Sequence, residues 1–259
     1  MSSLEQQVQA NLRRVNERIS TAAQAVSRDR REIALLAVSK TFGAEAVLAA
    51  ARAGQRGFGE NYVQEAIEKI AALRRLADAG EGAAAGLEWH FIGPIQSNKT
   101  RQIAEHFDWV ESVDRLKIAR RLNEQRPADR PPLNVLLQVN ISGEATKAGV
   151  APADLPTLAR AVADLPRLRL RGLMAIPEPD DDPVRQRLPL ARMRALFDQL
   201  REQLRDQLRS EPGASGPMLD TLSMGMSADL EAAIAEGSTE VRIGTALFGV
   251  RPRPPAPAA

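Results

Sequence analysis

Short apolar segments alternate with amphipathic segments along most of the chain. Apolar residues at helical spacing predict a first helix over 4–28. The apolar segments that follow predict strands at 32–39, 57–60, 88–93, 109–113, 133–140, 168–176, 220–224 and 240–245. Between the strands, helical spacing predicts helices near 44–54, 61–79, 98–106, 115–125, 153–164, 185–209 and 228–236.

Eight strands separated by helices indicate parallel βαβ units, and eight strands are the number that closes a (β/α)8, or TIM, barrel. A doubly wound open sheet is the competing architecture. The segment after the first strand, Ser39-Lys40-Thr41-Phe42-Gly43, lacks the Gly-x-Gly-x-x-Gly pattern of many such sheets. We therefore predict an α/β fold, a single (β/α)8 barrel over 1–250 with an extra N-terminal helix, followed by a flexible Pro/Ala-rich tail over 251–259.

Composition narrows the class of protein. The 259 residues are 44% hydrophobic and 26% charged, which is ordinary for a globular protein, and the net charge is only +2. Basic residues are interleaved with acidic ones and form no basic patch, so we expect no nucleic-acid partner. No run of about 18 apolar residues and no secretory signal is visible, so we expect a cytoplasmic protein without a membrane partner. The absence of cysteine excludes disulfides and thiolate metal sites.

Lys40 is the most informative residue of the chain. It ends the apolar run 33–39, and it is one of only five lysines. Partial burial at the mouth of an apolar strand lowers the pKa of an ammonium, and a neutral amine can form a Schiff base with an aldehyde. The alternative is that the Lys40 side chain extends into water or pairs with a carboxylate.

The ends of the seventh and eighth predicted strands could hold a phosphate. They read Ser223-Met224-Gly225-Met226-Ser227 and Arg242-Ile243-Gly244-Thr245. In TIM barrels these two loops frequently bind phosphate through backbone N–H groups, although Ser227 would equally serve as an N-cap for the next helix. Arg242 shares a strand face with Gly244, which we expect to point inward. There it could donate to a pyridine nitrogen or pair with a carboxylate of a neighbouring strand.

Other polar residues at predicted strand ends have two readings each. Asn61 and Asn140 could bind a ligand or cap a turn, and His90 could be a general base or a structural residue. Lys147 could reach the barrel mouth or be a surface charge. The acidic triplet at 180–182 lacks companion ligands at suitable spacing, so we expect a solvated loop and no metal.

Several long segments together closely resemble the YggS/PROSC family of pyridoxal phosphate (PLP)-binding proteins, also called PLP homeostasis proteins. The matching segments are residues 36–41, 58–65, 89–99, 171–177, 223–227 and 241–245. The resemblance implies a barrel like the N-terminal domain of alanine racemase, in which Lys40 holds PLP as a Schiff base and Arg242 lies at the pyridine nitrogen. It further implies that Ser223, Gly244 and Thr245 hold the phosphate, that Asn61 lies near the ring and that Lys147 approaches the cofactor.

The resemblance also implies a cofactor carrier in vitamin B6 homeostasis, with apo PLP enzymes as recipients, and no robust enzyme activity. Racemases with a similar barrel need a second base, a tyrosine on an added β domain, whereas the single tyrosine here is Tyr62 and no β domain is visible. An unprotonated pyridine is also a poor electron sink. A weak amino-acid racemase is the first alternative, and a Schiff-base aldolase or phosphosugar enzyme without a cofactor is the second. The missing domain also removes one usual dimer surface, so we expect a monomer.

Overall fold

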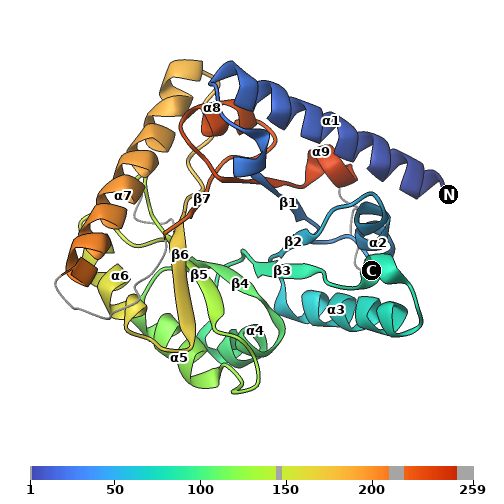
Figure 1. Cartoon of the computed structure of the whole chain (residues 1–259), viewed down its shortest axis with the longest axis horizontal. Helices are drawn as coiled ribbons and strands as arrows, with labels where there is room; N and C mark the ends of the chain where they lie inside the picture. Colours follow the sequence, from blue (N-terminus) through green and yellow to red (C-terminus); the bar gives the residue numbers. More distant parts are fainter. Residues whose placement is uncertain (1, 144–147, 210–218, 250–259) are drawn as a thin grey trace, which may run out of the picture.

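Eight parallel strands close into a barrel in the computed structural model, which describes residues 2–143, 148–209 and 219–249. Each strand pairs with the next one in sequence, and β8 pairs with β1 (Figure 1). The strands are β1 (Ala34–Val38), β2 (Gly57–Glu60), β3 (Glu88–Phe91), β4 (Trp109–Val113), β5 (Leu133–Gln138), β6 (Leu168–Met174), β7 (Thr221–Ser223) and β8 (Glu240–Ile243).

Helices surround the barrel and alternate with its strands. They are α1 (Ser3–Ala25), α2 (Ala44–Arg52), α3 (Val63–Asp78), α4 (Thr100–His106), α5 (Leu116–Gln125), α6 (Leu155–Ala163), α7 (Pro183–Arg209), α8 (Leu230–Ala235) and α9 (Thr245–Phe248). Short 3-10 helices occupy Arg30–Glu32, Gly82–Ala84 and Ser97–Lys99. In the described part of the chain, no helix combines the length and the apolar character needed to cross a bilayer.

The extra helix α1 lies across the outside of the barrel and packs on α2, α8 and α9 (Figure 1). Its buried face consists of Val8, Leu12, Val15 and Ile19, spaced three or four residues apart, as expected for an amphipathic helix. Ser2 and Glu5 form a capping box at its start. The helix thus covers the junction between the first and last βα units, where the barrel closes.

The predicted fold, a (β/α)8 barrel with an extra N-terminal helix, is confirmed. Every predicted strand and helix is present, with ends that differ by a few residues. Helix α9 was not predicted, because four residues are too few to show a helical period. The proposed tail at 251–259 lies outside the described residues, so the domain boundary stays a prediction.

Candidate functional site: a cationic cavity at the mouth of the barrel

A cavity of about 270 Å³ opens at the carboxyl ends of the strands, the face on which TIM barrels carry their active sites. Lys40 and Arg242 are the charged residues among the described side chains that line it, so the cavity attracts anions. Its described lining comprises Val38, Lys40, Phe42, Asn61, Ile92, Ile176, Met226, Ser227, Ala228, Arg242, Gly244 and Thr245.

Lys40 is half-buried in the turn that follows β1, where the backbone is unusual. The next residue, Thr41, has a φ of 70°, a left-handed conformation that is disfavoured for a β-branched side chain. Such a conformation costs about 1–3 kcal/mol and persists only where the surroundings enforce it. The Thr41 N–H donates to Oε1 of Glu65 over 2.6 Å, which supplies part of that enforcement.

The Arg242 side chain lies inside the barrel at the bottom of the cavity, and two hydrogen bonds fix its guanidinium. Nη1 donates to the Ser223 hydroxyl at 2.6 Å, and Nη2 donates to the carbonyl of Ala175 at 2.8 Å. The residue is only 4% exposed. The sequence left open a direct ion pair with a strand carboxylate. In the structure the contact with a carboxylate runs through Ser223, whose hydroxyl donates to Glu111 at 2.7 Å.

The contact between Ser223 and Glu111 crosses the interior of the barrel, because β7 and β4 are not neighbours in the sheet. Glu111 also bonds Nδ1 of His90 at 2.7 Å, and Glu240 lies 3.9 Å from the same nitrogen. Burial and the charge of Glu111 raise the pKa of Glu240 to about 8. Burial opposes ionisation of Glu111, but His90, Arg242 and Ser223 together hold its pKa below the usual range.

His90, Glu111 and Glu240 form the one group with metal-ligand spacing among the described residues. Both oxygens of Glu111 and Nδ1 of His90 already have hydrogen-bond partners in the protein. The His90 ring also stacks on Trp109, with centroids 5.1 Å apart. His90 and Glu111 therefore support Arg242 through Ser223, and the surroundings of His90 favour a structural role for it. The third member, Glu240, keeps a buried Oε1 without a hydrogen-bond partner in the described part of the chain.

Asn61 offers the cavity a hydrogen-bond acceptor that the protein leaves unused. Its Oδ1 is buried and has no hydrogen-bond partner among the described residues. Gly93 fixes the backbone at this point, since a Cβ on residue 93 would lie 2.3 Å from the Asn61 carbonyl oxygen. A buried polar atom without a partner is uncommon, and at a cavity wall it is available to a ligand.

Gly244 and Thr245 form the wall of the cavity at the end of β8. A Cβ on residue 244 would lie 3.3 Å from the Val38 carbonyl oxygen, so a larger residue would crowd the adjoining strand end. Ser227, which follows the adjacent strand β7, lines the cavity instead of capping a helix. Helix α8 begins three residues later at Leu230, after Asp229, whose carboxylate accepts from the Met226 N–H at 2.6 Å.

The structure thus brings five of the seven predicted site residues to one cavity: Lys40, Asn61, Arg242, Gly244 and Thr245. Ser223 lies one layer deeper and contacts the site through Arg242. Lys147 lies outside the described residues. The apolar lining residues Phe42, Ile92 and Ile176 escaped the sequence analysis, because only their position at strand ends could have indicated them.

Two further sequence alternatives can be compared with the structure. Asn140 accepts from the Gly143 N–H at 3.1 Å, as a turn cap does, and does not line the cavity. In the acidic triplet, Asp180 and Asp182 both pair with Arg185. These carboxylates form local ion pairs in their loop and have no link to the cavity.

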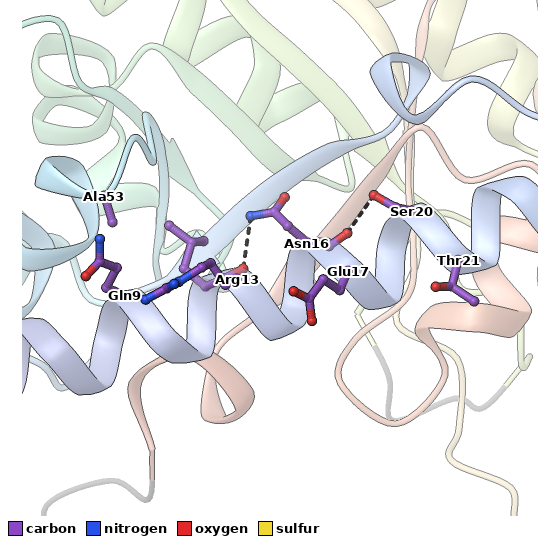
Figure 2. A pocket seen from close by; sticks show the side chains of 8 residues that line it. Gln9, Arg13, Asn16, Glu17, Ser20, Thr21 and Ala53 are labelled. Carbon is purple, nitrogen blue, oxygen red and sulfur yellow. Dashed lines mark hydrogen bonds between the residues drawn. The ribbon is translucent and has the colours of Figure 1, made fainter.

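A separate hollow of about 460 Å³ lies along α1, beside Ala53 at the end of α2 (Figure 2). Its polar side chains Asn16 and Ser20 already have partners in the protein: Asn16 donates to the Leu12 carbonyl and accepts from Arg30, and Ser20 donates to the Asn16 carbonyl. Arg13 and Glu17 add one charge of each sign to its lining. This open surface lacks the converging donors and the net charge that distinguish the mouth cavity.

The fold and the mouth cavity define a class: (β/α)8-barrel proteins with a lysine-containing cationic site at the carboxyl ends of the strands. The comparison with protein families is more specific. The model of the family described as "Alanine racemase, N-terminal domain" matches residues 6–252, so the chain belongs to that family.

Within the family, the chain is similar to proteins named pyridoxal phosphate homeostasis protein. It is 60% identical to the one from Pseudomonas aeruginosa over 241 residues, which cover 93% of this chain and 94% of the relative. It is 55% identical to the one from Escherichia coli K12, over 93% of this chain and 95% of the relative. These matches confirm the resemblance to the YggS/PROSC family.

Solved structures agree with this assignment. PipY of Synechococcus elongatus with PLP bound aligns with a TM-score of 0.73 and 37% identity, over 89% of this chain and all of that one. The alanine racemase of Corynebacterium glutamicum aligns with a TM-score of 0.59 at 15% identity, over 98% of this chain and 63% of the racemase. At that identity, the racemase shows a shared fold and nothing more.

Proposed function

We propose that this protein binds PLP covalently through Lys40 and serves in intracellular vitamin B6 homeostasis. The observation that carries the proposal is the mouth cavity, which combines a lysine, a supported arginine and an unused buried acceptor. The PLP-bound structure of PipY and the names of the relatives support it. When bound, PLP supplies an aldehyde, to which the Lys40 amine adds with loss of water to form an imine.

The residues of the cavity fit each part of PLP. A phosphate dianion suits a cationic cavity whose wall at Gly244 and Thr245 leaves backbone close to the ligand, while Ser227 offers a hydroxyl. Arg242 uses two of its five N–H donors on Ser223 and Ala175, which leaves donors for the ring nitrogen. Because arginine keeps its protons, that nitrogen would stay unprotonated. The Asn61 Oδ1 can accept from the ring hydroxyl.

The lining of the cavity favours a carrier over a racemase. A racemase needs two groups that move protons on opposite sides of the substrate carbon. The described residues that line this cavity include no carboxylate, histidine or tyrosine beside Lys40. The single tyrosine, Tyr62, is 57% exposed and lies outside the lining. With Lys40 as the one proton-moving group among the described lining residues, the site can hold and release an aldehyde, and those residues supply no second base.

The first test is a spectrum of the purified protein with PLP, followed by borohydride reduction and peptide mass spectrometry. We expect an imine absorbance band and one reduced adduct at Lys40. Lys40→Ala should abolish both, while Lys117→Ala, on the exposed face of α5, should change neither. An adduct that survives Lys40→Ala would contradict the assignment to Lys40. No adduct in the wild type would contradict the proposal and leave a cofactor-free Schiff-base enzyme as the alternative.

The second test concerns catalysis. We expect the PLP-loaded protein to leave the α-proton of L- or D-alanine unexchanged in deuterated water over hours. Rapid exchange would replace the carrier proposal with a racemase.

In a third test, the protein is mixed with apo PLP enzymes, its proposed recipients in the cytoplasm. Reactivation faster than the spontaneous release of PLP would show direct transfer, and reactivation at the release rate would show passive buffering.

The oligomeric state needs a separate measurement. Light scattering of the purified protein tests the proposal that it is a monomer.

A further inference from the structure

A second lysine, Lys69, lies buried behind the PLP site and outside the cavity lining. It is on α3, its side chain is only 3% exposed, and its ammonium has three oxygen partners. Nζ donates to the Ser39 carbonyl at 2.9 Å, to Glu60 Oε1 at 2.5 Å and to Glu65 Oε1 at 3.2 Å. An ammonium has three N–H donors, so every donor is used.

These partners adjoin the two cavity residues nearest to them in sequence. Ser39 precedes Lys40, and the Glu65 oxygen that binds Lys69 also accepts from the Thr41 N–H. Glu60 precedes Asn61 in the chain, and its Oε1 accepts from the Ser39 hydroxyl at 2.6 Å. The backbone is therefore held on both sides of Lys40, by contacts that converge on one buried ammonium.

Hydrophobic packing of α3 against the barrel does not require a lysine at position 69. Helix α3 already buries Val63, Ala66, Ile70 and Leu73 against the barrel, and an apolar side chain would extend that face. Burying a charge is unfavourable unless it is paired, and here its partners are also buried or half-buried. Burial raises the pKa of Glu60, and the charge of Lys69 opposes that rise. The ion cluster thus stabilises a specific backbone shape at the strand ends.

We infer that Lys69 is a positioning residue for Lys40: with Glu60 and Glu65 it holds the left-handed turn at Thr41 and presents the Lys40 amine to the cavity. The inference rests on the proposed PLP site. It goes beyond that site because Lys69 touches neither the cavity nor the reacting amine among the contacts described. Without the ammonium, the turn loses its common anchor and samples other conformations.

The test uses Lys69→Met, which keeps an unbranched side chain one atom shorter and removes the charge. In the PLP-free protein, we expect amide hydrogen exchange at Thr41 to become at least tenfold faster. On addition of PLP, we expect the imine with Lys40 to form at least tenfold more slowly. Lys117→Met is the matched surface control, and Ile70→Val is the control for weaker packing of α3. Neither control should change the two rates more than twofold.

Wild-type rates for Lys69→Met, in a folded protein, would overturn the inference, even if its melting temperature fell as far as that of Ile70→Val. Should Lys69→Met not fold, Glu65→Ala decides, because it removes the acceptor of the Thr41 N–H and leaves Lys69 paired with Glu60. We expect at least threefold faster Thr41 exchange, and an unchanged rate overturns the inference. If the wild type forms no imine at Lys40, the proposed function fails, while the exchange measurement still tests the role of Lys69.

Discussion

At the mouth of the barrel, Lys40 and Arg242 face a cavity with no carboxylate among its described lining residues, whereas charges of both signs meet at the floor, the amino ends of the strands. There Arg171 pairs with Asp220 at 2.6 Å, and its guanidinium lies 4.6 Å from the centre of the Trp109 ring. Both ends are polar and hollowed. The two ends differ in the sign of their charge: among the described lining residues, carboxylates outnumber arginines at the floor, while the mouth has two cationic residues. Each end has a buried acceptor without a hydrogen-bond partner among the residues that the structure describes, Oε1 of Glu240 at the floor and Oδ1 of Asn61 at the mouth.

A single strand shows the same contrast. On β8, Glu240 and Arg242 are two residues apart and share the inward face. Glu240 lines the floor hollow, and Arg242 lines the mouth cavity. Polar residues inside a barrel are therefore weak indicators of a ligand site. A buried acceptor without a partner occurs at both ends, so the stronger indicator is a cationic lining at the carboxyl ends of the strands, where TIM barrels carry their active sites.

We expect the largest effect from an added Cβ that would collide with the backbone at the mouth of the barrel, compared with an added Cβ at the floor. In Gly93→Ala the new Cβ would lie 2.3 Å from the Asn61 carbonyl oxygen, and a backbone contact cannot move away cheaply. We expect the free energy of unfolding to fall by about 3 kcal/mol and PLP affinity to fall about tenfold. The measurements are urea denaturation and PLP titration.

Gly57→Ala is the matched control at the floor, because the nearest atom to its Cβ would be in the Leu36 side chain, at an ordinary contact distance of 3.4 Å. We expect a change below about 1 kcal/mol and unchanged PLP affinity. If both alanine variants lost PLP affinity equally, the separation between the mouth and the floor would be wrong.

The second prediction concerns Glu240 and pH. Its pKa is raised in the folded protein from 4.5 to about 8, so between these values the folded state binds more protons than the unfolded state. Stability due to this group therefore falls as the pH rises from about 4.5 to 8. Glu240→Gln, which mimics the protonated acid, should raise the free energy of unfolding at pH 8 by about 2–4 kcal/mol and change it little at pH 5.

Denaturant melts at both pH values check this prediction. Glu68→Gln, at an exposed position on α3, is the control and should show no such gain at pH 8. If Glu240→Gln raised the free energy of unfolding equally at pH 5 and pH 8, Glu240 would be ionised at both pH values, contrary to its raised pKa.

The smallest expected effect lies in the floor ion pair. Arg171→Met keeps an aliphatic chain over Trp109 but removes the pair with Asp220, whose side chains are 21% and 31% exposed. We expect a loss of about 1 kcal/mol, since partly exposed pairs contribute little, with unchanged PLP affinity. Arg18→Met, in the more exposed pair with Glu231, should cost less still. Thermal melts and PLP titration measure both, and weaker PLP binding in Arg171→Met would show that the floor contributes to the site.

Those site residues whose positions follow from strand ends or from side-chain alternation along a strand could be predicted from the sequence. Lys40 follows the first apolar run, and Arg242 shares a face with Gly244, so both positions follow from local pattern. Asn61 could be placed at the mouth, but its lack of a partner is visible only after the neighbouring elements have packed. Lys69 looked like an ordinary helix residue, because only Glu65 shares its helix, while Ser39 and Glu60 come from the ends of two strands.

Sequence by itself determined the barrel and the strand ends that form its mouth, because apolar periodicity is local and strand direction follows from βαβ connections. The tertiary structure alone decided which polar groups satisfy one another. Ser223 turns toward Glu111 because β7 faces β4 across the closed barrel, and no local spacing encodes that distance. Closure of the sheet sets these contacts, and they leave the mouth with its positive charge.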